Sequence, residues 1–78
     1  LLTNREYELL YLLASMPNQT VTFEQIGEAV FGSYVPSDRR TIMVTASRLR
    51  KKLEKYTGLS NFIETVWSKG YLFRVREK

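Results

Sequence analysis

The chain has 78 residues, of which 44% are hydrophobic and 26% charged, a composition that indicates one small globular domain covering residues 1–78. It contains neither cysteine nor histidine, which excludes a disulfide framework, a thiolate or imidazole metal site, and catalysis by a cysteine nucleophile or a histidine base. We therefore expect a protein that is not an enzyme and uses no metal or cofactor, and no apolar run approaches the roughly 20 residues that span a membrane.

Charge is divided unevenly along the chain. Residues 1–38 carry one basic and five acidic side chains, whereas residues 39–78 carry eleven basic and three acidic ones, which together give the net charge of +4. A basic half beside an acidic half indicates an anionic partner for one face of the protein. The alternative is a solvated basic helix, and charge alone favours neither interpretation.

The first predicted helix begins after Thr3 or Asn4, both of which are suitable N-cap residues. Pro17 cannot continue a helix, so we expect this one to end there. Between these points apolar side chains recur at helical spacing: Tyr7, Leu9, Leu10, Leu12, Leu13, Ala14 and Met16.

A short extended connector at Val21 leads to a second predicted helix at about residues 23–31. Thr22 and Gln25, three residues apart, form a capping box at its start. Gly32 stands where a C-cap glycine belongs. Residues 32–38 contain glycine, serine and proline, which predicts a loop.

The third predicted helix begins after Ser37 or Asp38, runs from about Arg39 to Lys55, and ends before Gly58. One apolar stripe is expected to face the core: Ile42, Ala46, Leu49, Leu53 and Tyr56. The opposite side carries Arg40, Val44, Ser47, Arg48, Lys51 and Lys55, flanked by Arg50 and Lys52. Short polar groups, a small apolar group and long cations match what a DNA major groove presents.

Other interpretations of this outward face remain open. Val44 is also compatible with a buried contact to a neighbouring element. Arg48 is also compatible with an ion pair to Glu54 or Asp38. The lysines are also compatible with simple solvation, because phosphate contacts tolerate many positions.

The last part of the chain is predicted to be a β-hairpin. Residues 61–66 and 71–75 are rich in β-branched and aromatic side chains, and Gly70 between them can supply a positive-φ turn position. Three helices followed by a hairpin predict an α+β winged helix-turn-helix fold. The wing is then formed by Trp67, Ser68 and Lys69.

Two residues of this hairpin are candidate DNA contacts. Lys69 can reach a phosphate or the minor groove, and Thr65 can bond a backbone phosphate. For Trp67 the alternative is packing on the domain, since large aromatic side chains beside turns are often buried. For Arg74 and Arg76 the alternative is a solvated strand face.

Blocks of residues along nearly the whole chain form one pattern: Leu2-Thr3, Glu6, Leu9-Leu10, Arg40-Thr41-Ile42, Val44, Ser47-Arg48-Leu49-Arg50-Lys51-Lys52-Leu53, Ile63, Thr65-Val66, Gly70-Tyr71 and Phe73. In combination they resemble the OmpR/PhoB-type effector domain of bacterial response regulators. The resemblance implies a cytoplasmic bacterial regulator that binds direct-repeat promoter DNA as a tandem dimer. It also implies an upstream phospho-accepting receiver domain that is not in this chain.

The resemblance assigns roles to residues. It places the third helix in the major groove and the wing in the minor groove, with Arg48 reading a base and Val44 meeting a thymine methyl. The resemblance assigns contacts with the DNA backbone to Arg40, Thr45, Ser47, Arg50 and Thr65. The hydroxyl of Thr41 and the charges of Lys51, Lys52 and Lys55 make these four residues further candidates for phosphate contacts. The loop expected to contact RNA polymerase is Ser33, Tyr34, Val35, Pro36 and Ser37.

The chain also departs from the family pattern. Trp67 stands where some members place arginine, Met43 where the pattern commonly has aspartate, and Thr45 where some members have histidine. The family's four-stranded N-terminal sheet is absent, so a trimmed segment or a reduced variant is expected, with apolar surface exposed on the first helix. The alternative functions are a winged-helix protein-recognition module and the head domain of a membrane-anchored regulator.

Overall fold

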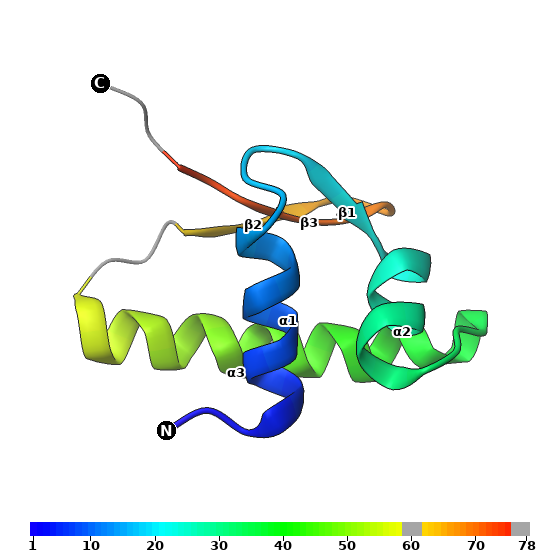
Figure 1. Cartoon of the computed structure of the whole chain (residues 1–78), viewed down its shortest axis with the longest axis horizontal. Coiled ribbons are helices and arrows are strands. Elements are labelled where there is room, and N and C mark those ends of the chain that lie inside the picture. Colours follow the sequence, from blue (N-terminus) through cyan, green and yellow to red (C-terminus); the bar gives the residue numbers. More distant parts are fainter. Residues whose placement is uncertain (59–61, 76–78) are drawn as a thin grey trace.

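A computed structural model describes residues 1–58 and 62–75. Figure 1 shows α3 along the lower part of the view and the sheet along the upper part, with α1 crossing α3 and reaching the sheet and α2 overlapping the first part of α3. This arrangement confirms the predicted winged-helix architecture. The elements in chain order are α1 (Asn4–Ala14), β1 (Thr20–Thr22), α2 (Phe23–Phe31), the 3-10 turn η1 (Pro36–Asp38), α3 (Arg39–Thr57), β2 (Ile63–Val66) and β3 (Gly70–Phe73).

Helix α1 begins where the sequence predicts and ends before the predicted end at Pro17. Thr3 caps it through a reciprocal pair: its hydroxyl accepts from the Glu6 N–H (3.2 Å), and the Glu6 carboxylate accepts from the Thr3 N–H (3.0 Å). The helix ends at Ala14, ahead of Pro17, with Ser15 as C-cap. Its buried apolar stripe is narrower than predicted, because Tyr7 and Ala14 are exposed. The Tyr11 ring is exposed as well, in keeping with the apolar surface expected on this helix.

Helix α2 matches its prediction. Thr22 and Gln25 form the capping box, and Gly32 ends the helix with φ +87°. Tyr34 in the following loop packs on Gly27, where a Cβ would lie 2.6 Å from the tyrosine Cδ1. Glycine at this helical position therefore lets the loop lie against α2.

The sheet contains a strand that the sequence did not predict. Val21 belongs to β1, and the three antiparallel strands have the order β1-β3-β2. Val21 pairs with Tyr71, and Val66 on the other side pairs with Gly70. A three-residue strand is too short to show a period of two, and its place is set by pairing with β3.

Gly70 is required for a different reason from the one predicted. Its φ is not positive, and Ser68 supplies the left-handed turn conformation with φ +62°. A Cβ on Gly70 would clash with the Val21 carbonyl oxygen and lie 2.9 Å from the Thr22 Cα. Glycine therefore allows β1 and β3 to approach each other at the base of the wing.

The core lies where α1, α2, α3 and the sheet meet. Phe23 and Tyr71 pack edge to face within it, with ring centroids 5.8 Å apart. From α3 it receives Ile42, Ala46 and Leu49, whereas Leu53 is half-buried. The prediction that Tyr56 joins this stripe was wrong, since 66% of this residue is exposed near the end of α3. The buried apolar residues are Leu9, Leu13, Val21, Phe23, Ile26, Val30, Ile42, Ala46, Leu49, Ile63 and Tyr71.

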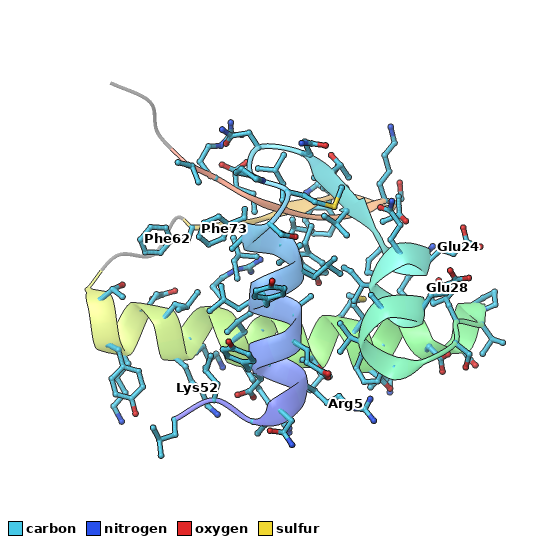
Figure 2. The ribbon with its side chains drawn as sticks, viewed as in Figure 1. Arg5, Glu24, Glu28, Lys52, Phe62 and Phe73 are labelled. Atoms are coloured by element: carbon cyan, nitrogen blue, oxygen red, sulfur yellow. The ribbon has the colours of Figure 1, made fainter. Side chains whose placement is uncertain are left out.

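One buried ion pair joins α1 to α3. The Glu6 carboxylate is almost fully buried and lies 2.6 Å from the Lys52 Nζ, which also donates to the Leu1 carbonyl (3.0 Å). This hydrogen bond from Lys52 lowers the pKa of Glu6, against the effect of burial. Figure 2 shows Lys52 on the part of α3 beside the start of α1. These contacts show that the fold holds the Lys52 ammonium group, and its predicted contact with DNA stays a prediction.

Replacing Gly70 by alanine should destabilise the domain by about 2–3 kcal/mol, because the added methyl has no space beside β1. The measurement is the free energy of unfolding in urea. Gly32→Ala is the control, since a Cβ there meets no atom within 4 Å. It should cost only about 1 kcal/mol, from the left-handed backbone. Equal losses would show that crowding by β1 is not the reason for glycine at position 70.

Replacing Glu6 by glutamine should lower the free energy of unfolding by about 1–2 kcal/mol near neutral pH, because the Lys52 charge loses its partner. The pair stabilises the native protein fully above the ordinary glutamate pKa of 4.5, and this contribution is lost as pH falls through the lower pKa of the folded state. Urea unfolding at several pH values should therefore show the difference shrinking in acid.

The matched control is Glu28→Gln. Within the described residues the exposed Glu28 carboxylate has no ion pair, so this variant should unfold like the parent protein at every pH. A Glu6→Gln variant as stable as the parent near neutral pH would contradict the assigned role of the pair.

Candidate nucleic-acid interface

The start of α3 is held by a 3-10 turn. Asp38 was predicted as a possible cap of α3, but its carboxylate instead accepts a hydrogen bond from the Val35 N–H (3.0 Å), and no side chain caps α3. The turn therefore closes on itself and leads directly into Arg39. At the other end α3 continues to Thr57 and stops at Gly58, with φ +74° as the predicted C-cap.

Most of the predicted contact residues lie together on the exposed side of α3. Val44 is 42% exposed, so the alternative of a buried contact is wrong. Arg48 has no ion pair with Glu54 or Asp38 anywhere in the part of the chain that the structure describes. Its guanidinium is thus available to a ligand. The exposed residues are Arg40, Thr41, Val44, Ser47, Arg48, Lys51 and Lys55.

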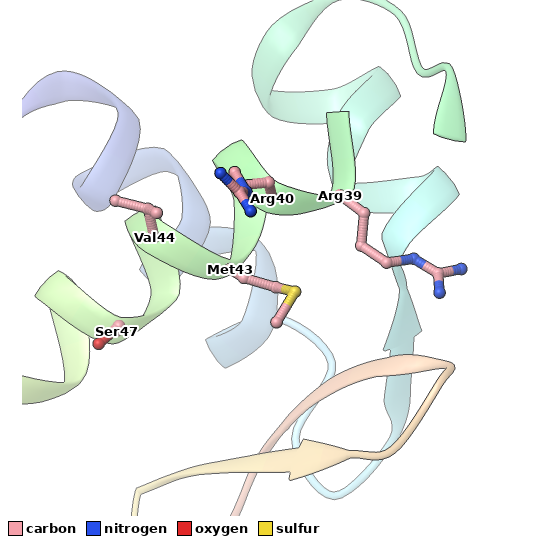
Figure 3. Close-up of a pocket in the computed structure, with 5 residues that line it drawn as sticks. All are labelled: Arg39, Arg40, Met43, Val44 and Ser47. Atoms are coloured by element: carbon pink, nitrogen blue, oxygen red, sulfur yellow. The ribbon is translucent and has the colours of Figure 1, made fainter. Parts of the chain in front are cut away.

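A shallow hollow lies on the first two turns of this exposed side. We call it the α3 hollow. Figure 3 shows its lining: Arg39, Arg40, Met43, Val44 and Ser47. Its surface is mainly apolar, and its lining includes the apolar side chains of Met43 and Val44 together with two arginines from the start of α3. The sequence predicted three of these as contact residues, Arg40, Val44 and Ser47, and did not include Arg39 or Met43.

Thr45 is less available than its neighbours. Its residue is half-buried, and its hydroxyl donates to the Thr41 carbonyl one turn earlier (2.9 Å). A threonine hydroxyl that donates within its own helix has only its acceptor capacity left. A phosphate contact from Thr45 would therefore require its hydroxyl to rotate.

Arg50 and Thr65 are neighbours, although fifteen positions separate them in sequence. The Arg50 Nη2 donates to the Thr65 Oγ1 (3.1 Å), which joins α3 to β2. Among the described residues the buried Arg50 Nε has no hydrogen-bond partner. Burial raises the pKa of Tyr71 nearby, and the Arg50 charge opposes this shift. Two predicted backbone contacts are thus parts of one bridge between helix and wing.

The wing is the turn between β2 and β3. Trp67 is 83% exposed at its tip, so the alternative that its ring packs on the domain is wrong. The Lys69 N–H donates to the Val66 carbonyl (3.0 Å), and the Lys69 carbonyl accepts from the Phe23 N–H (3.0 Å). The base of the wing is therefore fixed to the start of α2, while Trp67 and Ser68 project.

The basic residue that follows β3, Arg74, is paired with an acidic side chain. Arg74 makes two hydrogen bonds to Glu64, at 2.7 and 2.9 Å, which lower the pKa of Glu64 and raise that of Arg74. Arg74, which directly follows β3, thus forms a surface ion pair with Glu64 of β2. Asn61, in the first predicted strand, and Arg76, just after the second, lie outside the described residues.

Two arginines that sequence reasoning did not assign lie over aromatic rings. Arg39 stands 4.6 Å above the Phe23 ring centroid, and Arg5 stands 4.5 Å above that of Phe31. Because these partners are far apart in sequence, no local pattern could have revealed the pairs. Figure 2 shows the Arg5 side chain extending from α1 on the side of α2, with Glu24 and Glu28 on the outer side of α2.

The predicted polymerase-contact loop has four exposed residues, namely Ser33, Val35, Pro36 and Ser37, whereas Tyr34 is half-buried against Gly27. Within residues 1–58 and 62–75 no group of acidic side chains could hold a metal ion. No helix in these ranges is long and apolar enough to cross a membrane.

Comparisons with known proteins agree on one family. The model of the family "Transcriptional regulatory protein, C terminal" matches residues 1–73. The cell cycle response regulator CtrA of Brucella anthropi is 37% identical over 73 residues, which cover 94% of this chain and 32% of CtrA. The chain therefore spans about a third of the length of this curated relative.

Solved structures give the same result. The DNA-binding domain of Klebsiella pneumoniae RstA, in complex with the RstA box, has a TM-score of 0.82 at 31% identity, covering 95% of this chain and 73% of that domain. The DNA-binding domain of the response regulator AdeR, in complex with an intercistronic region, has a TM-score of 0.84 at 27% identity, covering 96% of this chain and 74% of that domain.

Sequence and fold thus agree over almost the whole chain. The family is one of transcriptional regulators and not of enzymes. The chain belongs to the OmpR/PhoB-type family of winged-helix DNA-binding domains of response regulators.

Proposed function

We propose that residues 1–78 form a single domain that binds duplex promoter DNA sequence-specifically, with α3 in the major groove and the wing at the adjacent minor groove. The observation that carries the proposal is the outward side of α3, where Arg48 lacks a protein partner among the described residues and Val44 is exposed. Relatives solved in complex with DNA support it. Without DNA, exposed Val44 between cations has no evident purpose.

Each side chain takes a role that suits its chemistry. Arg48 reads a guanine, because a guanidinium can bond guanine O6 and N7 together, and Val44 meets a thymine methyl. Lys69 contacts a phosphate near the wing, with Trp67 and Ser68 beside it. The residues proposed to contact the DNA backbone are Arg40, Thr41, Thr45, Ser47, Arg50, Lys51, Lys55 and Thr65.

The chain is proposed to act within a larger bacterial regulator. CtrA is about three times as long as the matched region, which leaves room for a further domain such as the upstream receiver domain that we propose. We propose cytoplasmic function as the output domain of a two-component system, with tandem dimers on direct repeats. The loop Ser33 to Ser37 is the proposed contact for RNA polymerase, supported by the exposure of four of its five residues.

Replacing Arg48 by alanine tests the base-reading role. The variant should lose about 1–3 kcal/mol of binding free energy on a site selected from random duplex DNA, and its preference at one base pair should relax. Affinity is measured by gel shift at fixed salt. Parent affinity should also fall steeply with salt, because bound phosphates release counterions. An Arg48→Ala variant with parental affinity and preference would refute the assignment. Failure of the parent to select any motif would instead favour recognition of an acidic protein.

Adjacent lysines provide a matched pair. Lys51→Ala should weaken binding on all sequences alike and reduce the slope of log affinity against log salt by about one, since one phosphate contact is lost. Lys52→Ala should leave this slope unchanged and lower the free energy of unfolding instead, because it removes the partner of Glu6. A reversed result, with Lys52 setting the slope, would show that its ion pair opens on DNA.

A further inference from the structure

The α3 hollow has a defined geometry. Arg40, Met43, Val44 and Ser47 occupy positions i, i+3, i+4 and i+7 of one helix, so they surround a single depression on its surface. Ser47 has the smallest side chain of the four, which leaves the depression open at that end. Figure 3 shows the four side chains around it, with Arg39 at the start of the helix.

The hollow combines apolar walls with cationic surroundings. Met43 is 46% exposed and Val44 is 42% exposed, which is a large apolar area for the side of a helix that carries long cations. From Arg39 to Leu53 this helix has no acidic residue, so nothing along this stretch repels phosphates. The occupant of the hollow should therefore present small apolar groups from within an anionic surface.

Duplex DNA meets this description in its major groove. Thymine carries a C5-methyl there, the apolar group that a base pair displays on that edge. Met43 is unbranched and polarizable and can adjust to such a group, whereas Val44 is rigid. Since the two side chains are adjacent in sequence, they diverge by about 100° around the helix and reach neighbouring bases.

We propose that Met43 is a second methyl-reading residue, so that Met43 and Val44 together recognise two neighbouring thymine methyls at the α3 hollow. This inference rests on the proposed DNA-binding function and adds a specificity-determining residue to it. The half-site should then contain two thymines on adjacent base pairs, on one strand or on opposite strands. Arg40 is placed to hold the phosphate beside them.

The test uses the full chain and the duplex site that it selects from a random library. Each thymine is replaced in turn by deoxyuridine, which pairs identically and lacks only the C5-methyl. Dissociation constants are measured at fixed salt. For the parent, deoxyuridine should weaken binding about threefold to fivefold at two neighbouring positions, the effect of burying one methyl group.

Variants assign each methyl to a side chain. Met43→Ala should abolish the deoxyuridine effect at one of the two positions, and Val44→Ala at the other. Met43→Leu should retain the effect, because it keeps an apolar side chain of similar size. Tyr11→Ala is the control: this exposed ring lies on α1, outside the hollow, so both effects should remain. Thermal unfolding confirms that the variants are folded, as expected for residues that are partly exposed.

The outcomes separate the two proposals. The methyl-reading role of Met43 is refuted if Met43→Ala shows every deoxyuridine effect of the parent, or if the parent shows none. In both cases a selected site would still support DNA binding. If no site is selected, the proposed function fails, and the role of Met43 fails with it.

Discussion

The rotational setting of α3 is the constraint on which the interface depends. Ile42, Ala46 and Leu49 are fully buried against the rest of the domain, and they fix which side of the helix faces outward. Turning α3 by one residue position would expose this stripe and bury cations, at a cost of several kcal/mol. The contact residues thus owe their direction to side chains that touch no ligand. Ala46 also helps to fix this setting, because its small side chain lets α3 pack closely against the rest of the domain.

Polar contacts fix the remaining degrees of freedom. The Glu6–Lys52 pair ties the later part of α3 to α1, and the Arg50–Thr65 hydrogen bond ties its middle to β2. The first contact is shielded from solvent on the glutamate side, whereas the second lies near the surface. DNA phosphates would compete for Arg50 and Thr65 but have no access to buried Glu6. The α1 contact is therefore constant, and the wing contact can respond to a ligand.

Periodicity and caps predicted most of the fold. The bounds of α2, the division of α3 into two faces, and the hairpin followed from local patterns such as the Thr22–Gln25 capping box. What the sequence did not predict depends on contacts between distant residues. Strand β1 exists because β3 offers a pairing edge, and Gly70 is needed because β1 approaches it. Lys52 looks like its neighbours in sequence, and only the position of Glu6 across the interface gives it a structural role.

The candidate site was predictable to the extent that it lies on one helix. Arg48 and Val44 follow from helical spacing, because side chains on one helix keep fixed relative directions. The exposure of the Trp67 ring could not be predicted from the sequence. Large aromatic rings are often buried, and the geometry of the β2–β3 turn places this one in solvent. The α3 hollow was also missed, because a depression depends on the relative sizes of four side chains.

The attachment of the wing to α2 sets where this protein tolerates a change of loop length. The hydrogen bond from the Phe23 N–H to the Lys69 carbonyl holds the second half of the turn, and Gly70 is pressed against β1. Added residues after Lys69 would break both contacts. Added residues between Trp67 and Ser68 would interrupt the Val66–Lys69 turn hydrogen bond but would lie at the exposed tip and leave both of these contacts in place. Natural or engineered variants of this domain with longer or shorter wings should therefore differ in the number of residues before Lys69. Changes there leave the contacts of the wing with α2 and β1 unchanged.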